Sequence, residues 1–311
     1  MNGKKNERPE KRQIAPILVV GEVLFDVFDD SRVIGGAPFN FACQLHSLGF
    51  ETCFASAVGD DAEGREILEF MSSKGMATDG VGRDRDGRTG QVLVTLDGEG
   101  VPEYDIIEDR AWDRIELTPA VEGLLDGEIS LICYGSLAQR SARSRAAVGR
   151  ILDRVGPDTV RVCDLNLRQH YYSRSLVEQC VRNADILKLN EEELETVREL
   201  LEYDGADFAA HLVEAYSLRC LCVTLGAKGS RLHLPGDTTI NHAIDKSILP
   251  GELKDTVGAG DAFTAMFCAG YLEKHDWDVL VDRASRFAAA LCTVRGALPE
   301  GEGFYEPFLC E

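Results

Sequence analysis

The residues of this chain best suited to chemistry lie in a short glycine-rich segment, DTVGAGDAF at 255–263. Gly258 and Gly260 leave the backbone bare, so its N–H groups can approach a ligand closely. An apolar run typical of a helix follows, and the unpaired N–H groups at a helix N-terminus bind anions such as phosphate. A phosphate-binding loop alone has no use for a carboxylate, yet Asp261 stands at this junction. The combination indicates an enzyme that deprotonates a hydroxyl beside a phosphoryl group, although an acid in a first helical turn also stabilises the helix dipole.

A second group of polar residues and glycines follows an apolar strand expected at 17–21. Asp26 comes shortly after that strand, and Gly35 and Gly36 precede Asn40, close to the start of an expected helix. Ligands of open α/β sheets bind beyond the carboxyl ends of the strands. A carboxylate accepts hydrogen bonds from hydroxyls and an amide both donates and accepts, so these residues could bind a polyhydroxy ligand. Ordinary surface turns are the alternative explanation.

Two further motifs follow expected strands. In DLNLR, 164–168, Arg168 is suited to spreading charge over phosphoryl oxygens, whereas a salt bridge at the strand end is the alternative explanation. Asn190 and Glu193 have the spacing of a capping box, which satisfies N–H groups at the start of a helix without any further function. Neither motif indicates a single role by itself.

Thr224, Gly226 and Gly229 form another turn from a strand into glycines. This turn is not a Walker A loop, because the pattern GxxxxGK[ST] is absent from the chain. The six histidines are dispersed and have no spacing typical of a metal site or a Ser-His-Asp triad. The sequence therefore gives no support to a histidine-ligated metal or to triad hydrolysis.

The elements that must position these residues alternate between short apolar strands and amphipathic helices. Besides the strand at 17–21, strands are expected at 52–57, 131–134, 160–164, 186–189 and 221–225, and helices at 41–48, 63–74, 141–155, 175–183, 191–201 and 208–216. This alternation predicts right-handed βαβ crossovers and an α/β fold with a doubly wound, mostly parallel sheet.

Two stretches, about 23–34 and 89–110, break the alternation. Each is typical of an antiparallel ribbon with no helix between its strands, and Asp97-Gly98 is a favoured hairpin turn. We expect the two ribbons to form a small β-sheet lid within one folding unit that spans 14–311. Residues 1–13 are basic and polar and are expected to be a disordered tail.

Composition restricts the class of partner. The 311 residues carry a net charge of −20 at pH 7, which argues against nucleic acid or an anionic membrane as a partner. The ten cysteines are scattered, several of them in apolar runs where buried thiols are usual, and this pattern fits a reducing cytoplasm. No apolar run approaches the length of a membrane span.

The motifs together resemble those of the PfkB, or ribokinase-like, carbohydrate kinases. The resemblance covers 17–298 in the family's order of motifs, and the form Gly-Gly-Ala-Pro at 35–38 is most similar to fructokinases. It implies a doubly wound α/β core with a β lid, ATP and Mg²⁺ as cofactors, and a monovalent-cation site for K⁺. One departure is Met266, where the family usually has glycine or alanine, and we expect it to affect packing rather than chemistry.

The resemblance also implies a role for each motif. Asp261 would be the catalytic base, and the amides of Gly258, Ala259 and Gly260 would form an anion hole. Arg168 would approach the substrate or the transferred phosphoryl group. The remaining residues would bind the sugar (Asp26, Gly35, Gly36 and Asn40), the nucleotide (Asn190, Thr224, Gly226, Gly229, Gly258 and Gly260), Mg²⁺ through water (Glu193) and the monovalent cation (Asp255).

The predicted reaction is transfer of the γ-phosphoryl group of ATP to a primary hydroxyl of a monosaccharide, with fructose as the first candidate. A 2-keto-3-deoxygluconate or nucleoside kinase of the same family is the alternative, and a catalytically silent sugar-sensing member is a third. A nicotinamide-dependent dehydrogenase would share the α/β pattern, but its GxGxxG fingerprint is missing after the first strand. The exposed edge strands of the lid allow either a monomer or a lid-mediated homodimer.

Overall fold

A nine-stranded sheet forms the centre of the computed structural model, which describes residues 14–96, 102–244, 251–299 and 301–309. Its strands lie in the order β13 (Thr238–His242), β12 (Ser230–Leu234), β11 (Cys220–Thr224), β10 (Ile186–Asn190), β9 (Val160–Asp164), β8 (Leu131–Tyr134), β1 (Ile17–Val20), β4 (Thr52–Gly59) and β5 (Val81–Asp84). All pairs from β11 to β5 are parallel, and β12 and β13 are antiparallel additions at one edge. The chain runs from β1 to β4 and β5 on one side, then returns to β8 on the other, so the doubly wound prediction is confirmed.

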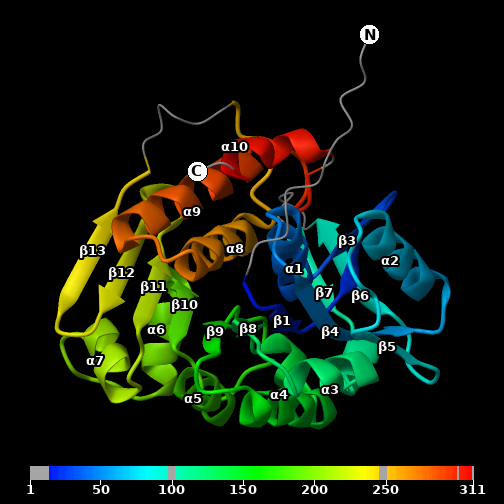
Figure 1. Cartoon of the computed structure of the whole chain (residues 1–311), viewed down its shortest axis with the longest axis horizontal. Helices are drawn as coiled ribbons and strands as arrows, with labels where there is room; N and C mark the ends of the chain where they lie inside the picture. The colour runs from blue at the N-terminus through cyan, green and yellow to red at the C-terminus, as the bar shows by residue number, and fades with distance from the viewer. Residues whose placement is uncertain (1–13, 97–101, 245–250, 300, 310–311) are drawn as a thin grey trace.

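Helices cover both faces of this sheet (Figure 1). Alternate residues of β1 enter two separate cores: Ile17 and Val19 join one, and Leu18 and Val20 join the other. The first core also receives α1 (Ala37–Ser47), α2 (Ala62–Ser73), α8 (Ala259–Leu272), α9 (Trp277–Leu291) and α10 (Glu306–Leu309). The second receives α3 (Pro119–Leu125), α4 (Ala142–Arg154), α5 (Arg174–Arg182), α6 (Glu191–Leu200) and α7 (Phe208–Ala215).

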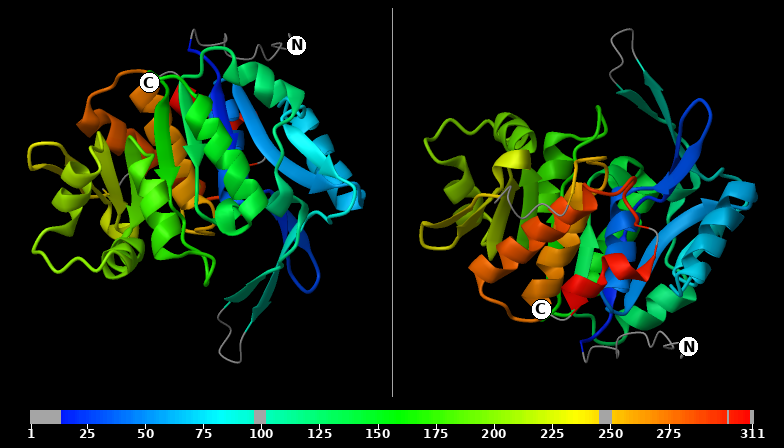
Figure 2. Two further views of the ribbon diagram at one scale, coloured as in Figure 1. Left: turned by 90° about the horizontal axis from the view of Figure 1, so that it is seen from below. Right: turned by 90° about the horizontal axis from the view of Figure 1, so that it is seen from above.

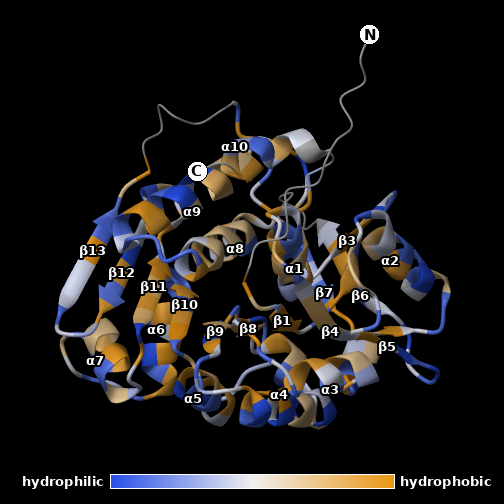
Figure 3. Ribbon diagram, in the orientation of Figure 1, coloured by the Kyte–Doolittle hydropathy of each residue, from blue (hydrophilic) through white to orange (hydrophobic). Residues whose placement is uncertain are grey.

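Hydrophobic residues are concentrated in the central strands, and the helices around them carry both hydrophobic and hydrophilic residues (Figure 3). Strands buried on both faces are expected to be continuously apolar in a parallel sheet. Short 3₁₀ turns connect some elements, at η1 (Ala111–Arg114), η2 (Leu137–Arg140), η3 (Gly226–Lys228) and η5 (Glu302–Phe304). Within the described ranges, no helix is long and apolar enough to cross a membrane.

A separate four-stranded sheet projects from the layered core (Figure 2). Its order is β3 (Arg32–Gly35), β2 (Leu24–Val27), β6 (Gly90–Leu96) and β7 (Pro102–Ile106). The pairs β2–β3 and β6–β7 are antiparallel, and β2 joins β6 in parallel, so the two predicted ribbons do combine into one small sheet. The predicted turn at Asp97-Gly98 and the predicted tail at 1–13 lie outside the described residues.

One arginine attaches the segment that follows β7 of the small sheet to the core. Arg140 donates to Asp113 Oδ1 through Nε and to Ile107 O through Nη2, each at 2.8 Å. Its guanidinium also lies 3.9 Å from the ring centroid of Trp112 and 4.6 Å from that of Tyr171. The base of the small sheet is therefore attached by a buried, stacked ion pair rather than by a loose linker.

Candidate active site

The motifs that begin at Asp164, Asn190 and Thr224 lie close together because they follow neighbouring parallel strands, whereas Asp26 and Gly35 lie in β2 and β3 of the small sheet. Lys188 of β10 is in register with Asp164 of β9, and Asn190 of β10 with Thr224 of β11. The carboxyl ends of these strands therefore form one edge of the sheet. Helix α8 contacts α1 and begins near that edge, so the glycine-rich segment lies among the strand-end motifs.

Asp261 and Asn40 are in direct contact although 221 residues separate them. Asn40 Nδ2 donates to Asp261 Oδ2 at 2.8 Å, which joins the first turn of α1 to the first turn of α8. The Oδ1 atom of Asn40 is buried and has no hydrogen-bond partner among the described residues. A buried acceptor without a partner is costly, so this atom is suited to a hydroxyl donor from a ligand.

Burial raises the pKa of Asp261 to about 7. The hydrogen bond from Asn40 opposes that rise, the neighbouring charge of Asp164 adds to it, and the positive charges of Lys188 and Arg168 lower the pKa again. A carboxyl group with a pKa near neutrality exchanges its proton readily at physiological pH. That property is the one a general base needs.

The turn into α8 depends on glycine. Gly258 is the N-cap with φ +75°, and a Cβ atom added there would lie 2.4 Å from the Cβ of Ala297. No larger residue fits without displacing that contact. The N–H of Ala259 donates to Thr256 O at 3.2 Å, so a phosphoryl oxygen bound to this amide would have to replace that long hydrogen bond.

On the sugar side of the predicted site, two glycines allow close approach of the acids. A Cβ atom at Gly35 would lie 2.8 Å from Asp26 Oδ2, and one at Gly36, whose φ is +112°, would lie 2.6 Å from the backbone oxygen of Glu22. Burial raises the pKa of Asp26 to about 6, and the positive charge of Arg168 opposes that rise. The Gly-Gly pair thus brings its own backbone against both acidic residues.

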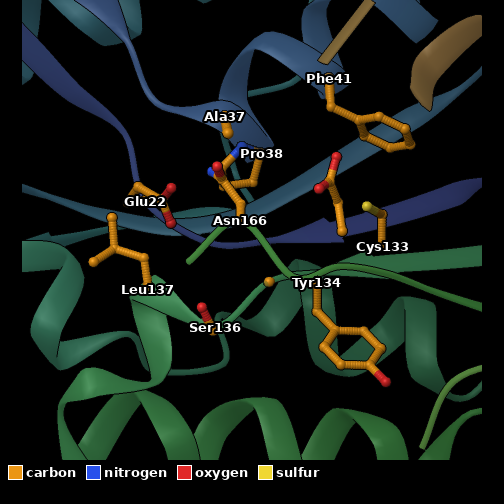
Figure 4. Close-up of a pocket in the computed structure, with 11 residues that line it drawn as sticks. Glu22, Ala37, Pro38, Phe41, Cys133, Tyr134, Ser136, Leu137 and Asn166 are labelled. Carbon is orange, nitrogen blue, oxygen red and sulfur yellow. The ribbon is translucent and has the colours of Figure 1, made fainter. Parts of the chain in front are cut away.

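A small pocket lies where the strand order reverses, between the end of β1 and the segment after β8. Figure 4 shows Glu22 and Leu137 at one side of it, Pro38 above and Ser136 below. This reversal is the place where doubly wound sheets bind ligands. Sequence reasoning missed Glu22, whose signal was an acid directly after the first apolar strand.

Glu22 is 4% exposed, and burial raises its pKa to about 7. Its own backbone N–H and the positive charges of Arg168 and Arg140 lower the pKa, whereas Asp261 raises it. Glu22 is therefore a second carboxyl group, besides Asp261, whose pKa lies near neutrality. It lies close enough to Asp261 for the two groups to influence each other's charge.

Arg168 does not lie on a continuation of β9. Asn166 has φ +46°, so the chain turns after Asp164, and the three polar residues of DLNLR do not share one face of an extended strand. Among the described residues, the backbone oxygen of Arg168 accepts from Tyr171 N, but its guanidinium group makes no hydrogen bond or ion pair. Its charge nevertheless lowers the pKa of Glu22, Asp26 and Asp261, and it is exposed for a ligand. The strand-end salt bridge is made by Asp164 with Lys188 instead.

Asn190 and Glu193 form the predicted capping box. Glu193 N donates to Asn190 Oδ1 and Asn190 N donates to Glu193 Oε2, both at 2.8 Å. Glu193 Oε1 accepts from Leu167 N at 2.8 Å, so backbone donors occupy both carboxylate oxygens. Glu193 therefore fits a metal contact through water better than direct ligation.

The turn after β11 also has glycine-dependent geometry. Gly226 has φ +56° and Gly229 has φ +107°, and a Cβ atom at Gly229 would lie 2.0 Å from the backbone oxygen of His242. Thr224 is the last residue of β11 and is half-buried, and Gly226 is exposed beside it. The turn leaves bare backbone at the edge of the sheet that Asn190 shares.

Asp255 holds two segments together. Its Oδ1 accepts from Val257 N at 3.0 Å and its Oδ2 from Gly296 N at 2.9 Å. The carboxylate thereby attaches the segment after α9 to the start of the glycine-rich segment. In the part of the chain that the structure describes, no cluster of three or more His, Cys, Asp or Glu residues could hold a metal ion by itself.

A buried lysine beneath α8 was not predicted. Lys188 Nζ lies 3.1 Å from Asp164 Oδ1, and Thr264 of α8 donates to Asp164 Oδ2 at 2.8 Å. The only signal in the sequence was a charged residue inside the apolar strand at 186–190. These contacts connect β9, β10 and the helix that carries Asp261.

Comparisons with known proteins show the family and the fold of this chain. The model of the family described as pfkB family carbohydrate kinase matches residues 13–300. A protein described as an uncharacterized sugar kinase from Pyrococcus horikoshii is 29% identical over 300 residues, 90% of this chain and 91% of that protein. Its crystal structure in complex with ATP has a TM-score of 0.71 at 25% identity and covers 91% of this chain and 94% of that one.

Proteins named fructokinase are also similar to this chain. The Escherichia coli fructokinase is 27% identical over 300 residues, 91% of this chain and 95% of that protein. The crystal structure of Vibrio cholerae fructokinase with fructose, ADP and calcium ion has a TM-score of 0.73 at 23% identity, covering 94% of this chain and 98% of that one. At that identity the second likeness concerns the fold alone.

Proposed function

Because this chain belongs to the pfkB family of carbohydrate kinases, we propose that it transfers the γ-phosphoryl group of ATP to a primary hydroxyl of fructose. The observation that carries the proposal is the hydrogen bond between Asn40 and Asp261. It joins the residues proposed for the sugar to those proposed for the phosphoryl group. We also propose a cytoplasmic location, in accord with the scattered cysteines.

Asp261 is the proposed base. It takes the proton of the attacking hydroxyl as the bond to the phosphoryl group forms, an effect typically worth about 10²–10⁴ in rate. The N–H groups of Gly258, Ala259 and Gly260 stabilise the negative charge on the phosphoryl oxygens. Arg168, exposed and unpaired within the described ranges, supplies positive charge to the same oxygens or to the substrate.

Asp26, Gly35, Gly36 and Asn40 bind the sugar in this proposal. Asp26 accepts hydroxyl hydrogen bonds, the bare backbone at the two glycines allows close approach, and Asn40 offers its unpartnered Oδ1. Glu22, whose backbone oxygen lies beside Gly36, adds a second acidic group near these residues. A neutral polyol suits such a surface, because a second anion would be repelled.

A sugar acid would need cations that this pocket has in short supply. Arg114 is already paired with Asp84 and Asp109. Arg168 remains without an ion pair beside Glu22 and Asp26, and the buried Nε of Arg110 has no hydrogen-bond partner among the described residues. Because Glu22 and Asp26 are acidic groups beside Arg168, we place neutral fructose ahead of the anionic 2-keto-3-deoxygluconate.

The nucleotide is assigned to the other end of the site. In this proposal the nucleotide is bound by Asn190, Thr224, Gly226 and Gly229. The backbone at the start of α8 also binds it, because the N–H groups at a helix N-terminus form an anion site. Mg²⁺, when bound with ATP, neutralises charge on the phosphates. Glu193 would hold the ion through water, since backbone N–H groups occupy its oxygens. Asp255 would stabilise a monovalent-cation site for K⁺ by holding its two segments in place.

The four-stranded sheet acts as the lid in this proposal. The sheet, attached at its base through Arg140, closes over the sugar and excludes water, which would otherwise accept the phosphoryl group. Such closure would have to release the contacts that Arg32 of β3 makes with Glu63 and Glu66 of α2. Strands β3 and β7 are the edges of the sheet and could pair with a second copy of the chain. A monomer and a lid-mediated homodimer are both compatible with this arrangement.

The test is a screen of ATP consumption with fructose, ribose, 2-keto-3-deoxygluconate, adenosine and inosine as acceptors. We expect the highest kcat/KM with fructose and a phosphorylated primary hydroxyl in the product. Turnover of the sugar acid or of a nucleoside in place of fructose would contradict the substrate but leave the base intact. Wild-type turnover by Asp261→Asn would contradict the base.

A further inference from the structure

We propose that the buried Lys188–Asp164 ion pair is a positioning element for Asp261, because it sets the electrostatic field in which that carboxyl group gains and loses its proton. The proposal rests on the proposed function, since it takes Asp261 to be the base. Lys188 does not touch the reacting atoms in this account. It acts on them through the first turn of α8.

The pair is largely buried, and Asp164 also lines the small pocket. Lys188 lies in β10 with 8% of its surface exposed, and its Nζ is 3.1 Å from Asp164 Oδ1. Asp164 ends β9 and stands opposite Lys188 in the parallel register. A buried charge without a partner costs several kcal/mol, so Asp164 offsets much of the cost of burying the Lys188 charge, and the carboxylates of Glu193 and Asp261 offset a further part of it.

Two contacts connect the ion pair to α8, the helix that contains Asp261. Thr264 Oγ1, one turn beyond the start of α8, lies 2.8 Å from Asp164 Oδ2 and 2.9 Å from the backbone oxygen of Gly260. A Cβ atom placed at Gly260 would lie 3.4 Å from Lys188 Nζ, so the ammonium group lies against the backbone directly before Asp261. A side chain at that position would contact the ammonium group.

The charges that face Asp261 come from several elements. Each group acts on the carboxyl group in a defined direction. The facing groups are the amide of Asn40 in α1, the carboxyl of Glu22 after β1, the thiol of Cys133 in β8, Asp164 at the end of β9, Arg168 beyond it, and Lys188 in β10. Burial raises the pKa of Cys133 well above its ordinary value, so this thiol contributes no charge.

The two members of the ion pair act in opposite directions. Asp164 raises the pKa of Asp261, whereas Lys188 lowers it. The carboxylates of Asp164, Glu193 and Asp261 raise the pKa of Lys188 despite its burial, so the lysine stays protonated throughout the physiological range. Removing the charge of Asp164 should therefore lower the pKa of Asp261, and removing the charge of Lys188 as well should raise it again. A pair that only stabilises the fold would not produce opposite signs.

The experiment compares wild type, Asp164→Asn and the double variant Asp164→Asn/Lys188→Met. Two readouts are measured: the acid limb of kcat/KM for the sugar at saturating ATP, and the ¹³C titration of the Asp261 carboxyl in the ligand-free protein. Asp164→Asn removes a like charge, so both midpoints should move down by about one pH unit. Adding Lys188→Met removes the cation, and both midpoints should move up again by about one unit.

The matched control is Arg283→Met in α9. Arg283 is also a buried cation, paired with Glu273 at 3.2 Å, and its loss should lower Tm without moving either midpoint. The proposal is overturned if Asp164→Asn moves the midpoints upward, or if adding Lys188→Met leaves them in place. Should the double variant fail to fold, Lys188→Gln in the same background serves the same comparison. The NMR titration needs no turnover, so failure here is distinct from failure of Asp261 as the base.

Discussion

Replacing Asn40 by leucine tests how the hydrogen bond from Asn40 sets the pKa of Asp261, the proposed base. Leucine has a similar size but cannot donate, so Asp261 Oδ2 would lose the hydrogen bond that it accepts at 2.8 Å. A hydrogen bond to a charged group is worth about 1.5–3 kcal/mol. Because one pKa unit corresponds to about 1.4 kcal/mol, the pKa of Asp261 should rise by about one to two units.

The rise reduces activity in a pH-dependent way. With a pKa of about 7, roughly half of Asp261 is ionised at pH 7. With a pKa of about 8 to 9, the ionised fraction at pH 7 is about one tenth to one hundredth. From this effect alone, kcat/KM at pH 7 should fall about 5- to 50-fold and recover as the pH approaches about 9. Loss of the sugar contact at Oδ1 would add a decrease that does not depend on pH.

The assay is kcat/KM for the sugar at saturating ATP across the acidic, neutral and alkaline range, since this parameter reports the ionisation of the free enzyme. Gln44→Met is the matched control. Gln44 is a buried amide one turn further along α1, where it donates to Ala297 O and accepts from Tyr305 Oη. The control should lose stability with an unmoved acid limb. If the limb of Asn40→Leu coincides with that of wild type, Asn40 does not stabilise the charge of Asp261 and the reasoning is refuted.

Two further predictions concern the lid and the second carboxyl group. Arg140→Met should raise KM for the sugar about tenfold with little change in KM for ATP, because the guanidinium holds Ile107 and Asp113 at the base of the lid. Steady-state kinetics with each substrate varied checks this, and equal rises in both KM values would contradict it. Glu22→Gln should raise Tm at about pH 8 but not at about pH 4, because the raised pKa of Glu22 means that its stabilising contribution is complete below the unfolded value of 4.5 and is lost as the pH rises through about 7. At about pH 8 the free energy of unfolding of Glu22→Gln should exceed that of wild type by about 3 kcal/mol. Thermal unfolding curves of the two proteins that differ equally at both pH values would contradict this prediction.

Much of the fold was predictable because its signals are local. Short, mostly apolar runs identified the inner strands β1, β8, β9, β10 and β11, although Arg161 interrupts β9 and Lys188 interrupts β10. Strand β5 was missed because its sequence, Val-Gly-Arg-Asp, is half polar, and β12 and β13 because they form an exposed antiparallel edge. Helix α1 begins at Ala37 rather than at 41, since Pro38 lies in its first turn, where proline is favoured.

The candidate site was predictable only in part. Motifs at the ends of central strands, such as Asp164 and Asn190, could be grouped because parallel strands share an edge, whereas Asp26 lies within β2 of the small sheet. The contact between Asn40 and Asp261 spans 221 residues, and no local pattern announces it. Lys188 was missed for a related reason: its partner Asp164 becomes adjacent only through the register of β9 and β10. Contacts that depend on strand register and helix packing cannot be predicted from the residue spacing within one segment.

The central claim is that Asp261 removes the proton of the acceptor hydroxyl. The most direct test is the kcat of Asp261→Asn with ATP and fructose, alongside its Tm and its affinity for both substrates. Asparagine keeps the size of the side chain but cannot accept that proton, so kcat should fall by about 10²–10⁴ while folding and binding are retained. A variant that binds both substrates and turns over at the wild-type rate would contradict the account.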